Sequence, residues 1–103
     1  MTTTPAVTPF AVRNAVAFAV IDELTAYGMT VAEAAEAFMI MPYKNHPASV
    51  DGYVAQFWRD DSGGWVMADS RDPAPEAERK FAVIEIDVGR LAREFDSDLA
   101  NAQ

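Results

Sequence analysis

Only two residues, Gly28 and Met29, separate two segments of the chain that have helical patterning. The first segment, residues 10–27, contains no proline or glycine. Its apolar side chains recur at helical spacing, in a stripe that is expected to include Val12, Val16, Val20, Leu24 and Tyr27. Gly28 is placed to end this helix, because glycine readily adopts the left-handed conformation that follows many helix termini. A link this short predicts that the two helices pack as an angled or antiparallel pair.

The second segment begins with a capping-box sequence. Thr30 is followed three residues later by Glu33, so the threonine hydroxyl can accept the Glu33 amide while the glutamate accepts the Thr30 amide. Pro42 prevents much extension beyond about Met39. The spacing predicts five inward-pointing apolar side chains in this helix: Val31, Ala34, Ala35, Phe38 and Met39.

The first helix is apolar on more than one face. The i, i+4 stripe lies on one side, whereas Phe10, Phe18 and Ile21 fall on the other. One interpretation is a central helix covered on both sides. The alternative is that these three side chains form a partner surface, in the simplest case a homodimer interface.

The second half of the chain has the patterning of strands. Residues 53–58 and 65–68 are rich in β-branched and aromatic side chains and flank a turn of aspartate, serine and glycine, which predicts a β-hairpin. Residues 71–78 are proline-rich and charged, which is typical of a solvated loop. The alternation in residues 81–88 predicts a half-buried third strand, with Ala82, Ile84, Ile86 and Val88 on one face. The i, i+4, i+8 apolar spacing after Gly89 predicts a closing helix.

These elements define an α+β fold in the order α-α-β-β-β-α, with two N-terminal helices, a three-stranded antiparallel sheet and a C-terminal helix. Helices packed on one face of the sheet would bury the apolar stripes of both. A chain of 103 residues has room for one hydrophobic core. We therefore expect a single domain over residues 10–103, preceded by a flexible arm over residues 1–9, where three consecutive threonines and two prolines stand.

The composition excludes several classes of function. Sixteen acidic residues against eight lysines and arginines give a formal net charge of −8, which disfavours unassisted binding to nucleic acid or to an anionic membrane surface. The absence of cysteine excludes disulfides, thiolate chemistry and zinc fingers. The longest apolar stretch, residues 10–21, is too short to span a bilayer, and we expect a soluble, cytoplasmic protein.

No pattern of residues points to catalysis, a cofactor or a metal. His46, Ser49 and Asp51 come nearest to a hydrolytic triad, but three residues so close in sequence rarely converge in that geometry. The paired carboxylates lack the spacing of a calcium loop, and no glycine-rich phosphate-binding sequence occurs. We therefore expect a protein that is not an enzyme and holds no cofactor.

The loop over residues 41–49 is one candidate partner-binding surface. No acidic residue occurs between residues 37 and 50, so Tyr43, Lys44 and His46 form the only locally basic and aromatic group in an acidic chain. We expect these side chains to be exposed together.

The predicted hairpin is a second candidate partner-binding surface. Trp58 and Trp65 flank its turn, which also carries Asp60 and Asp61. Two interpretations of the tryptophans are open: a cross-strand aromatic pair that stabilises the hairpin, or exposed anchors for a protein partner.

Residues 28–40, with the sequence GMTVAEAAEAFMI, resemble the first helix and turn of a helix-turn-helix DNA-binding domain, with the small Ala35 where two helices approach closely. The resemblance implies an alternative winged fold, in which residues 48–59 form the recognition helix and residues 65–88 the β-wing. The sequence departs from that family where Met39 replaces the usual turn glycine and where the link to the next helix is long. The alternative function is a DNA-binding transcriptional regulator.

The absence of catalytic groups, the negative charge and the apolar helix face together favour a small non-catalytic binding or regulatory protein that acts through protein–protein interaction. A narrower hypothesis is an inhibitor that presents acidic surface to a nucleic-acid-binding partner. The charge is polarised along the chain, because residues 51–98 hold twelve acidic residues against six basic ones, whereas residues 1–21 hold no acid.

Overall fold

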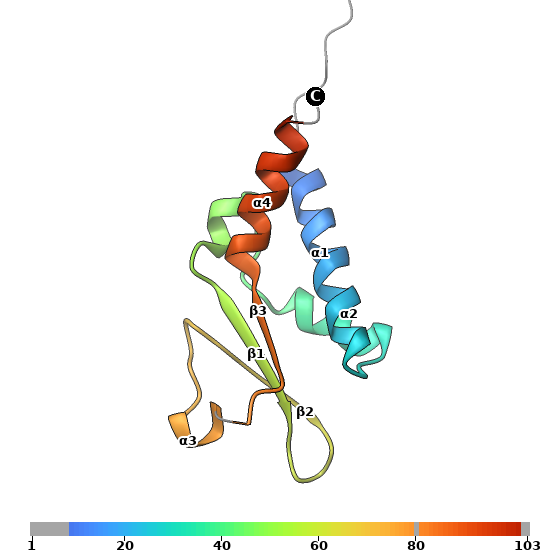
Figure 1. Ribbon diagram of the computed structural model, residues 1–103, viewed down its shortest axis with the longest axis vertical. Coiled ribbons are helices and arrows are strands. Elements are labelled where there is room, and N and C mark those ends of the chain that lie inside the picture. Colours follow the sequence, from blue (N-terminus) through green and yellow to red (C-terminus); the bar gives the residue numbers. More distant parts are fainter. Residues whose placement is uncertain (1–8, 80, 102–103) are drawn as a thin grey trace, which may run out of the picture.

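A three-stranded antiparallel sheet carries helices along one of its faces, and its last strand runs directly into the final helix (Figure 1). This computed structural model describes residues 9–79 and 81–101. The predicted α+β order of two helices, three strands and a closing helix is confirmed, with two short helices added inside segments that were expected to be loops. The elements are α1 (Pro9–Ala26), α2 (Val31–Met39), the 3-10 helix η1 (Pro47–Val50), β1 (Val54–Arg59), β2 (Trp65–Asp69), α3 (Glu76–Arg79), β3 (Ile84–Asp87) and α4 (Val88–Asn101).

α1 supplies one side of the hydrophobic core. Its i, i+4 stripe is fully buried, because side chains that repeat every four residues lie along one line of the helix. Burial of each valine or leucine contributes about 1.5–3 kcal/mol. The stripe consists of Val12, Val16, Val20 and Leu24.

The two ends of α1 differ from the prediction. Pro9 begins the helix, since its fixed φ suits the first helical turn, and the rest of the expected arm, residues 1–8, lies outside the described residues. At the other end Gly28 has φ of 103°, in the left-handed region expected of it. Tyr27 is exposed and does not join the stripe, because the helix ends at Ala26.

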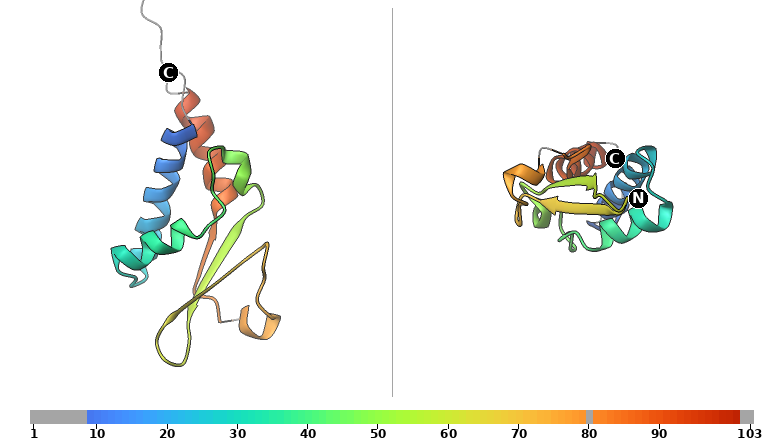
Figure 2. Two further views of the ribbon diagram at one scale, coloured as in Figure 1. Left: turned by 180° about the vertical axis from the view of Figure 1, so that it is seen from behind. Right: turned by 90° about the horizontal axis from the view of Figure 1, so that it is seen from below.

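β1 is the central strand of the sheet, whose order is β2-β1-β3. Phe57 of β1 lies opposite Met67 of β2 and Ile84 of β3, and these side chains share the face that meets the helices. The opposite face carries Gln56, whose side-chain amide donates to Glu85 over 3.0 Å. Figure 2 shows the sheet from behind and from below, with the hairpin turn extending beyond α2.

The third strand is shorter than its sequence predicts. Alternation was expected over residues 81–88, but β3 covers only Ile84–Asp87, and Phe81 and Val83 before it are exposed. The buried alternation is confirmed at Ile84 and Ile86. Val88 is buried as expected but already belongs to α4.

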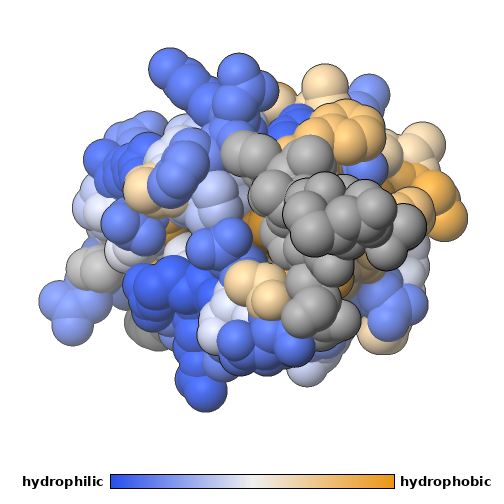
Figure 3. Space-filling model, turned by 90° about the horizontal axis from the view of Figure 1, so that it is seen from above, coloured by the Kyte–Doolittle hydropathy of each residue, from blue (hydrophilic) through white to orange (hydrophobic). Residues whose placement is uncertain are grey.

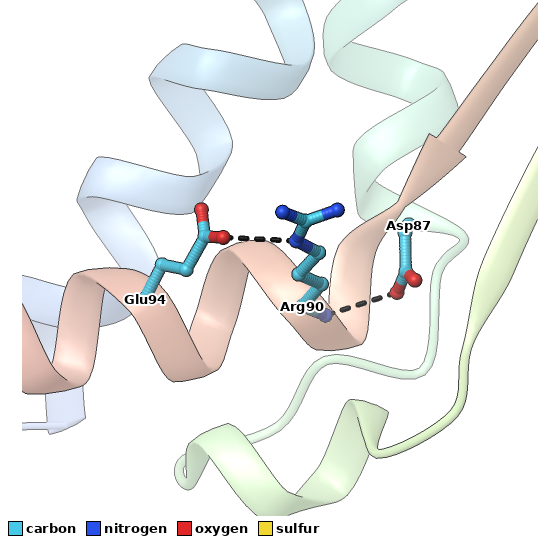
Figure 4. Close-up of polar contacts among 3 residues, drawn as sticks. All are labelled: Asp87, Arg90 and Glu94. Atoms are coloured by element: carbon cyan, nitrogen blue, oxygen red, sulfur yellow. Dashed lines mark hydrogen bonds and ion pairs between the residues drawn. The ribbon is translucent and has the colours of Figure 1, made fainter.

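The start of α4 is fixed by polar contacts (Figure 4). The Asp87 carboxylate accepts the Arg90 backbone amide over 3.0 Å, which satisfies one of the free amides in the first turn. The Arg90 guanidinium in turn forms an i, i+4 ion pair of 2.9 Å with Glu94. Because the Asp87 carboxylate caps this turn, the helix begins at Val88, directly after the strand, and includes Gly89.

The segment over residues 48–59 does not form a recognition helix, so the winged helix-turn-helix alternative is wrong. The segment holds the end of η1 and the whole of β1. Alternate side chains of β1 enter the core, as at Ala55 and Phe57, and this period of two is incompatible with a helix.

Gly89 brings the first turn of α4 into close contact with the chain before β1. Its amide donates to the Tyr53 carbonyl over 3.1 Å. A Cβ built on Gly89 would collide with the Val50 carbonyl oxygen and would lie 2.9 Å from the Gly52 nitrogen. Only glycine lets the first turn of α4 approach the chain between η1 and β1 this closely.

We predict that Gly89→Ala lowers the free energy of unfolding by about 1–3 kcal/mol, because the added methyl group must displace backbone. Urea denaturation followed by circular dichroism measures the change. Gly64→Ala is the matched control, since a Cβ there meets its nearest atoms at 3.5 Å, an ordinary contact distance. Equal stability of the Gly89 variant and the wild type would refute the close-approach explanation.

Candidate functional site

The loop over residues 41–49 does not present the expected basic and aromatic surface. Tyr43 is only 5% exposed and packs near the Phe38 ring, with centroids 6.2 Å apart. This burial raises the pKa of the Tyr43 phenol. Lys44 and His46 are exposed, but the His46 imidazole accepts the Ala48 amide over 3.1 Å and caps η1. Prediction failed for Tyr43 because nothing in the local sequence shows that the chain after Pro42 turns back into the core.

The two tryptophans of the hairpin lie on opposite faces of the sheet. Trp58 pairs with Val66, whereas Trp65 pairs with Arg59, and a one-residue offset reverses the direction of a strand side chain. The cross-strand tryptophan pair is therefore wrong. Trp58 is 6% exposed and therefore cannot serve as an exposed anchor. It lines a second groove together with Asp60 and Asp61 of the turn.

The hairpin turn uses one of its two aspartates internally. The Asp60 carboxylate accepts hydrogen bonds from the Ser62 hydroxyl at 2.6 Å, the Gly64 amide at 2.9 Å and the Ser62 amide at 3.0 Å. These bonds, that of the Ser62 hydroxyl first, lower the pKa of Asp60. Asp61 is exposed.

The proposed dimer surface on α1 is exposed in part. Phe10 and Phe18 face outward, with Phe18 74% exposed, whereas Ile21 is half-buried against the core. The interpretation of α1 as a helix covered on both sides is wrong, because no described element covers Phe10 or Phe18. Seen from above, hydrophobic side chains gather on the side of the molecule where α1 lies (Figure 3). A homodimer through this face stays a prediction.

A groove of about 520 Å³ lies between α2 and β2 and was not foreseen from the sequence. Its floor is apolar and comes from the helix-facing side of the sheet and from the link between the first two helices. The floor residues are Met29, Phe57, Trp65 and Met67.

The α2 wall of the groove carries an apolar lip and a charged rim. Met39 is 70% exposed and Ile40 is 72% exposed, although Met39 was expected to point inward. Only Ala34 and Phe38 of this helix are buried, so α2 contacts the core along a narrower line than its composition suggests. Val31, also expected inward, is exposed. The rim consists of Glu33 and Glu36.

Arg59 holds Trp65 in place at one end of the groove. Its guanidinium carbon lies 4.3 Å from the centre of the Trp65 ring, within the range of a cation–π contact. The same guanidinium donates to the Gly63 carbonyl over 2.8 Å. The Trp65 indole nitrogen is buried and has no hydrogen-bond partner among the described residues, so a donor at the groove is unsatisfied.

Glu33 is kept ionised by the capping box. Its carboxylate accepts the Thr30 amide over 2.9 Å, and its own amide donates to the Thr30 hydroxyl over 3.1 Å. The backbone hydrogen bond from Thr30 is the largest cause of the lowered pKa of Glu33, followed by the Thr30 side chain, with a smaller contribution from the positive charge of Arg59. Glu33 therefore keeps its negative charge at lower pH than an ordinary glutamate.

Neither a metal centre nor a membrane-spanning element stands out in the described part of the chain. Residues 9–79 and 81–101 contain no cluster of three or more metal-ligating side chains. Over the same ranges no helix has the length and apolar character needed to cross a membrane. Comparison with protein-family models, curated proteins and solved structures finds no match to this chain.

We predict that Thr30→Ala lowers the free energy of unfolding by about 0.5–2 kcal/mol, because the first turn of α2 loses its cap. The pKa of Glu33 should rise part of the way toward its ordinary value of 4.5, since the Thr30 amide can still donate. Urea denaturation and a carboxyl NMR titration measure the two effects.

The lowered pKa also sets the pH dependence of this contribution. A carboxyl group with a depressed pKa stabilises the fold fully above its ordinary pKa and loses that contribution as the pH falls through the lowered value. The wild type should therefore lose more stability than the Thr30 variant on acidification. Thr25→Ala in α1 is the control, since the Thr25 hydroxyl donates to the Asp22 carbonyl and caps no helix start. An unchanged pKa of Glu33 in the Thr30 variant would contradict the assignment of its lowered pKa to the capping box.

Proposed function

We propose that this protein is a non-catalytic binding module and that the groove between α2 and β2 takes an apolar, positively charged segment of a partner protein. The observation that carries the proposal is an open apolar groove with an exposed apolar lip and glutamates on its rim. Its volume is typical of sites that take a small ligand or a short segment of chain.

The exposed apolar surface at the groove is unfavourable in water, and a bound partner would remove it from solvent. Met39 and Ile40 both expose most of their side chains beside a floor that is already apolar. Exposed apolar surface that is contiguous and rimmed by polar residues is typical of a protein-interaction site. Methionine at Met29, Met39 and Met67 suits such a site, because its flexible side chain adapts to differently shaped partners.

The distribution of charge favours a positively charged partner segment at the groove. It favours less an inhibitor whose acidic surface would imitate the phosphates of a nucleic acid. Several carboxylates serve the fold itself: Asp60 holds the hairpin turn, Asp87 caps α4 and Glu94 pairs with Arg90. Glu36 instead faces the groove without a hydrogen bond from another described side chain. Complementary charge at such a rim speeds association and selects the partner. The protein's net charge of −8 acts in the same direction.

The proposal is tested by selecting random peptides displayed on phage against the wild-type protein. We expect selected peptides to combine lysine or arginine with valine, leucine or isoleucine. Met39→Lys should weaken their binding about tenfold or more, equivalent to about 1.4 kcal/mol, because the lip loses apolar contact and gains a repelling charge. Fluorescence anisotropy with the synthesised peptides measures the affinities.

Phe18→Lys is the matched control, because it also replaces an exposed apolar side chain of a helix by lysine but lies outside the groove. It should leave the affinity unchanged. Glu36→Gln should weaken binding and reduce its dependence on salt. The proposal fails if no peptide is enriched, if acidic peptides are selected, or if the Phe18 and Met39 variants lose affinity equally.

A further inference from the structure

We infer that the partner segment binds as an added β-strand, paired with the free edge of β2 beside the groove. The inference rests on the proposed function and specifies how the segment is held. Addition of an extended peptide to a sheet edge is a common mode of recognition, in which backbone hydrogen bonds provide affinity and alternate side chains provide specificity.

The hydrogen-bond pattern shows which groups of β2 are free. The Asp60 amide donates to the Gly64 carbonyl, and the Ser70 amide donates to the Val54 carbonyl, so the even-numbered residues of β2 point their backbone groups toward β1. Backbone groups alternate in direction along an antiparallel strand. The amides and carbonyls of Trp65 and Met67 therefore point away from β1, toward the open edge of the sheet.

The edge of β2 lacks the features that usually prevent strand pairing. Edge strands are commonly protected by charged side chains, proline or a bulge. The other edge strand, β3, carries Glu85 and Asp87. In β2 the only charged residue is Asp69, whose carboxylate is engaged by the Tyr53 hydroxyl at 3.0 Å and by two backbone amides.

The free edge and the groove coincide. Three consecutive residues of β2, Trp65, Val66 and Met67, line the groove, although the Val66 side chain points to the other face of the sheet. The groove therefore reaches the edge of the strand. An added strand would lie about 4.8 Å from β2. Its alternate side chains would enter the groove beside Met67 and face α2.

The rim charges specify the sequence of the added strand. Apolar side chains suit the floor, whereas lysine or arginine suits the side that meets Glu36. Arg59 already stacks on Trp65, and its positive charge acts on Glu33, so a basic residue of the partner is expected beside Glu36. A second copy of this chain is a poorer occupant, because each copy has a net charge of −8 and the same glutamate rim.

Amide hydrogen exchange, measured by NMR, tests strand addition on the wild-type protein. The probe is a nine-residue synthetic peptide of alternating lysine and valine. In the free protein the amides of Val66 and Ala68 should be protected, and those of Trp65 and Met67 should exchange rapidly. At saturating peptide the exchange of Trp65 and Met67 should slow about tenfold or more, as both amides become hydrogen-bonded.

The possible outcomes separate the two proposals. If the peptide perturbs groove resonances without protecting Trp65 and Met67, strand addition is wrong while the binding function stands. If the alternating peptide does not bind although phage-selected peptides do, strand addition is also wrong. If no peptide of any kind binds the groove, the binding function fails as well. A dimer that forms through β2 in the absence of peptide, detected by sedimentation, would overturn the choice of occupant.

Two variants of Met67 separate its backbone from its side chain. Met67→Ala keeps the outward amide and should reduce peptide affinity only severalfold. Met67→Pro removes that amide, and proline is tolerated at an edge position whose amide faces outward. It should reduce affinity much further than the alanine variant. Equal affinity of the two variants, with both folded by circular dichroism, would contradict strand addition, and exchange in the wild type decides the question if the proline variant unfolds.

Discussion

The burial of one stripe of α1 beside α4 and α2 is the contact on which the arrangement of the helices depends. Val12 and Leu24 stand at the two ends of this stripe, and both are fully buried. Because α1 is held along its whole length, the short link after it places α2 beside the hairpin. α2 then buries Ala34 and Phe38 and packs Ala37 against the core, whereas Val31 and Met39 stay exposed. The groove is thus a consequence of how the core packs.

Strand register decides which side of the sheet each aromatic residue serves. The pairing of Arg59 with Trp65 sends Trp65 toward α2, and the neighbouring Trp58 toward the opposite face. A shift of one residue would reverse both, since side chains alternate along a strand. Trp65 becomes part of the groove floor, whereas Trp58 is buried on the other face of the sheet.

The acidic residues serve two purposes in this fold: they cap helices, and they form the charged rim of the groove. Some of them take the place of missing backbone partners, as Asp87 does at the start of α4 and Glu33 does at the start of α2. A carboxylate that accepts an amide hydrogen bond stays ionised at lower pH, because the bond favours its charged form. Glu33 combines both purposes, since it caps its helix and also lines the groove.

The amino-acid sequence by itself determined the features that depend on neighbouring residues: the capping box at Thr30, the end of α1 at Gly28, the hairpin, and the α+β order. Local hydrogen bonds and the periods of helix and strand specify these. The sequence could not show that Tyr43 is buried, that Met39 is exposed, or that Gly89 meets the chain before β1. Only the tertiary structure decided these, because each depends on which distant element lies across from the residue.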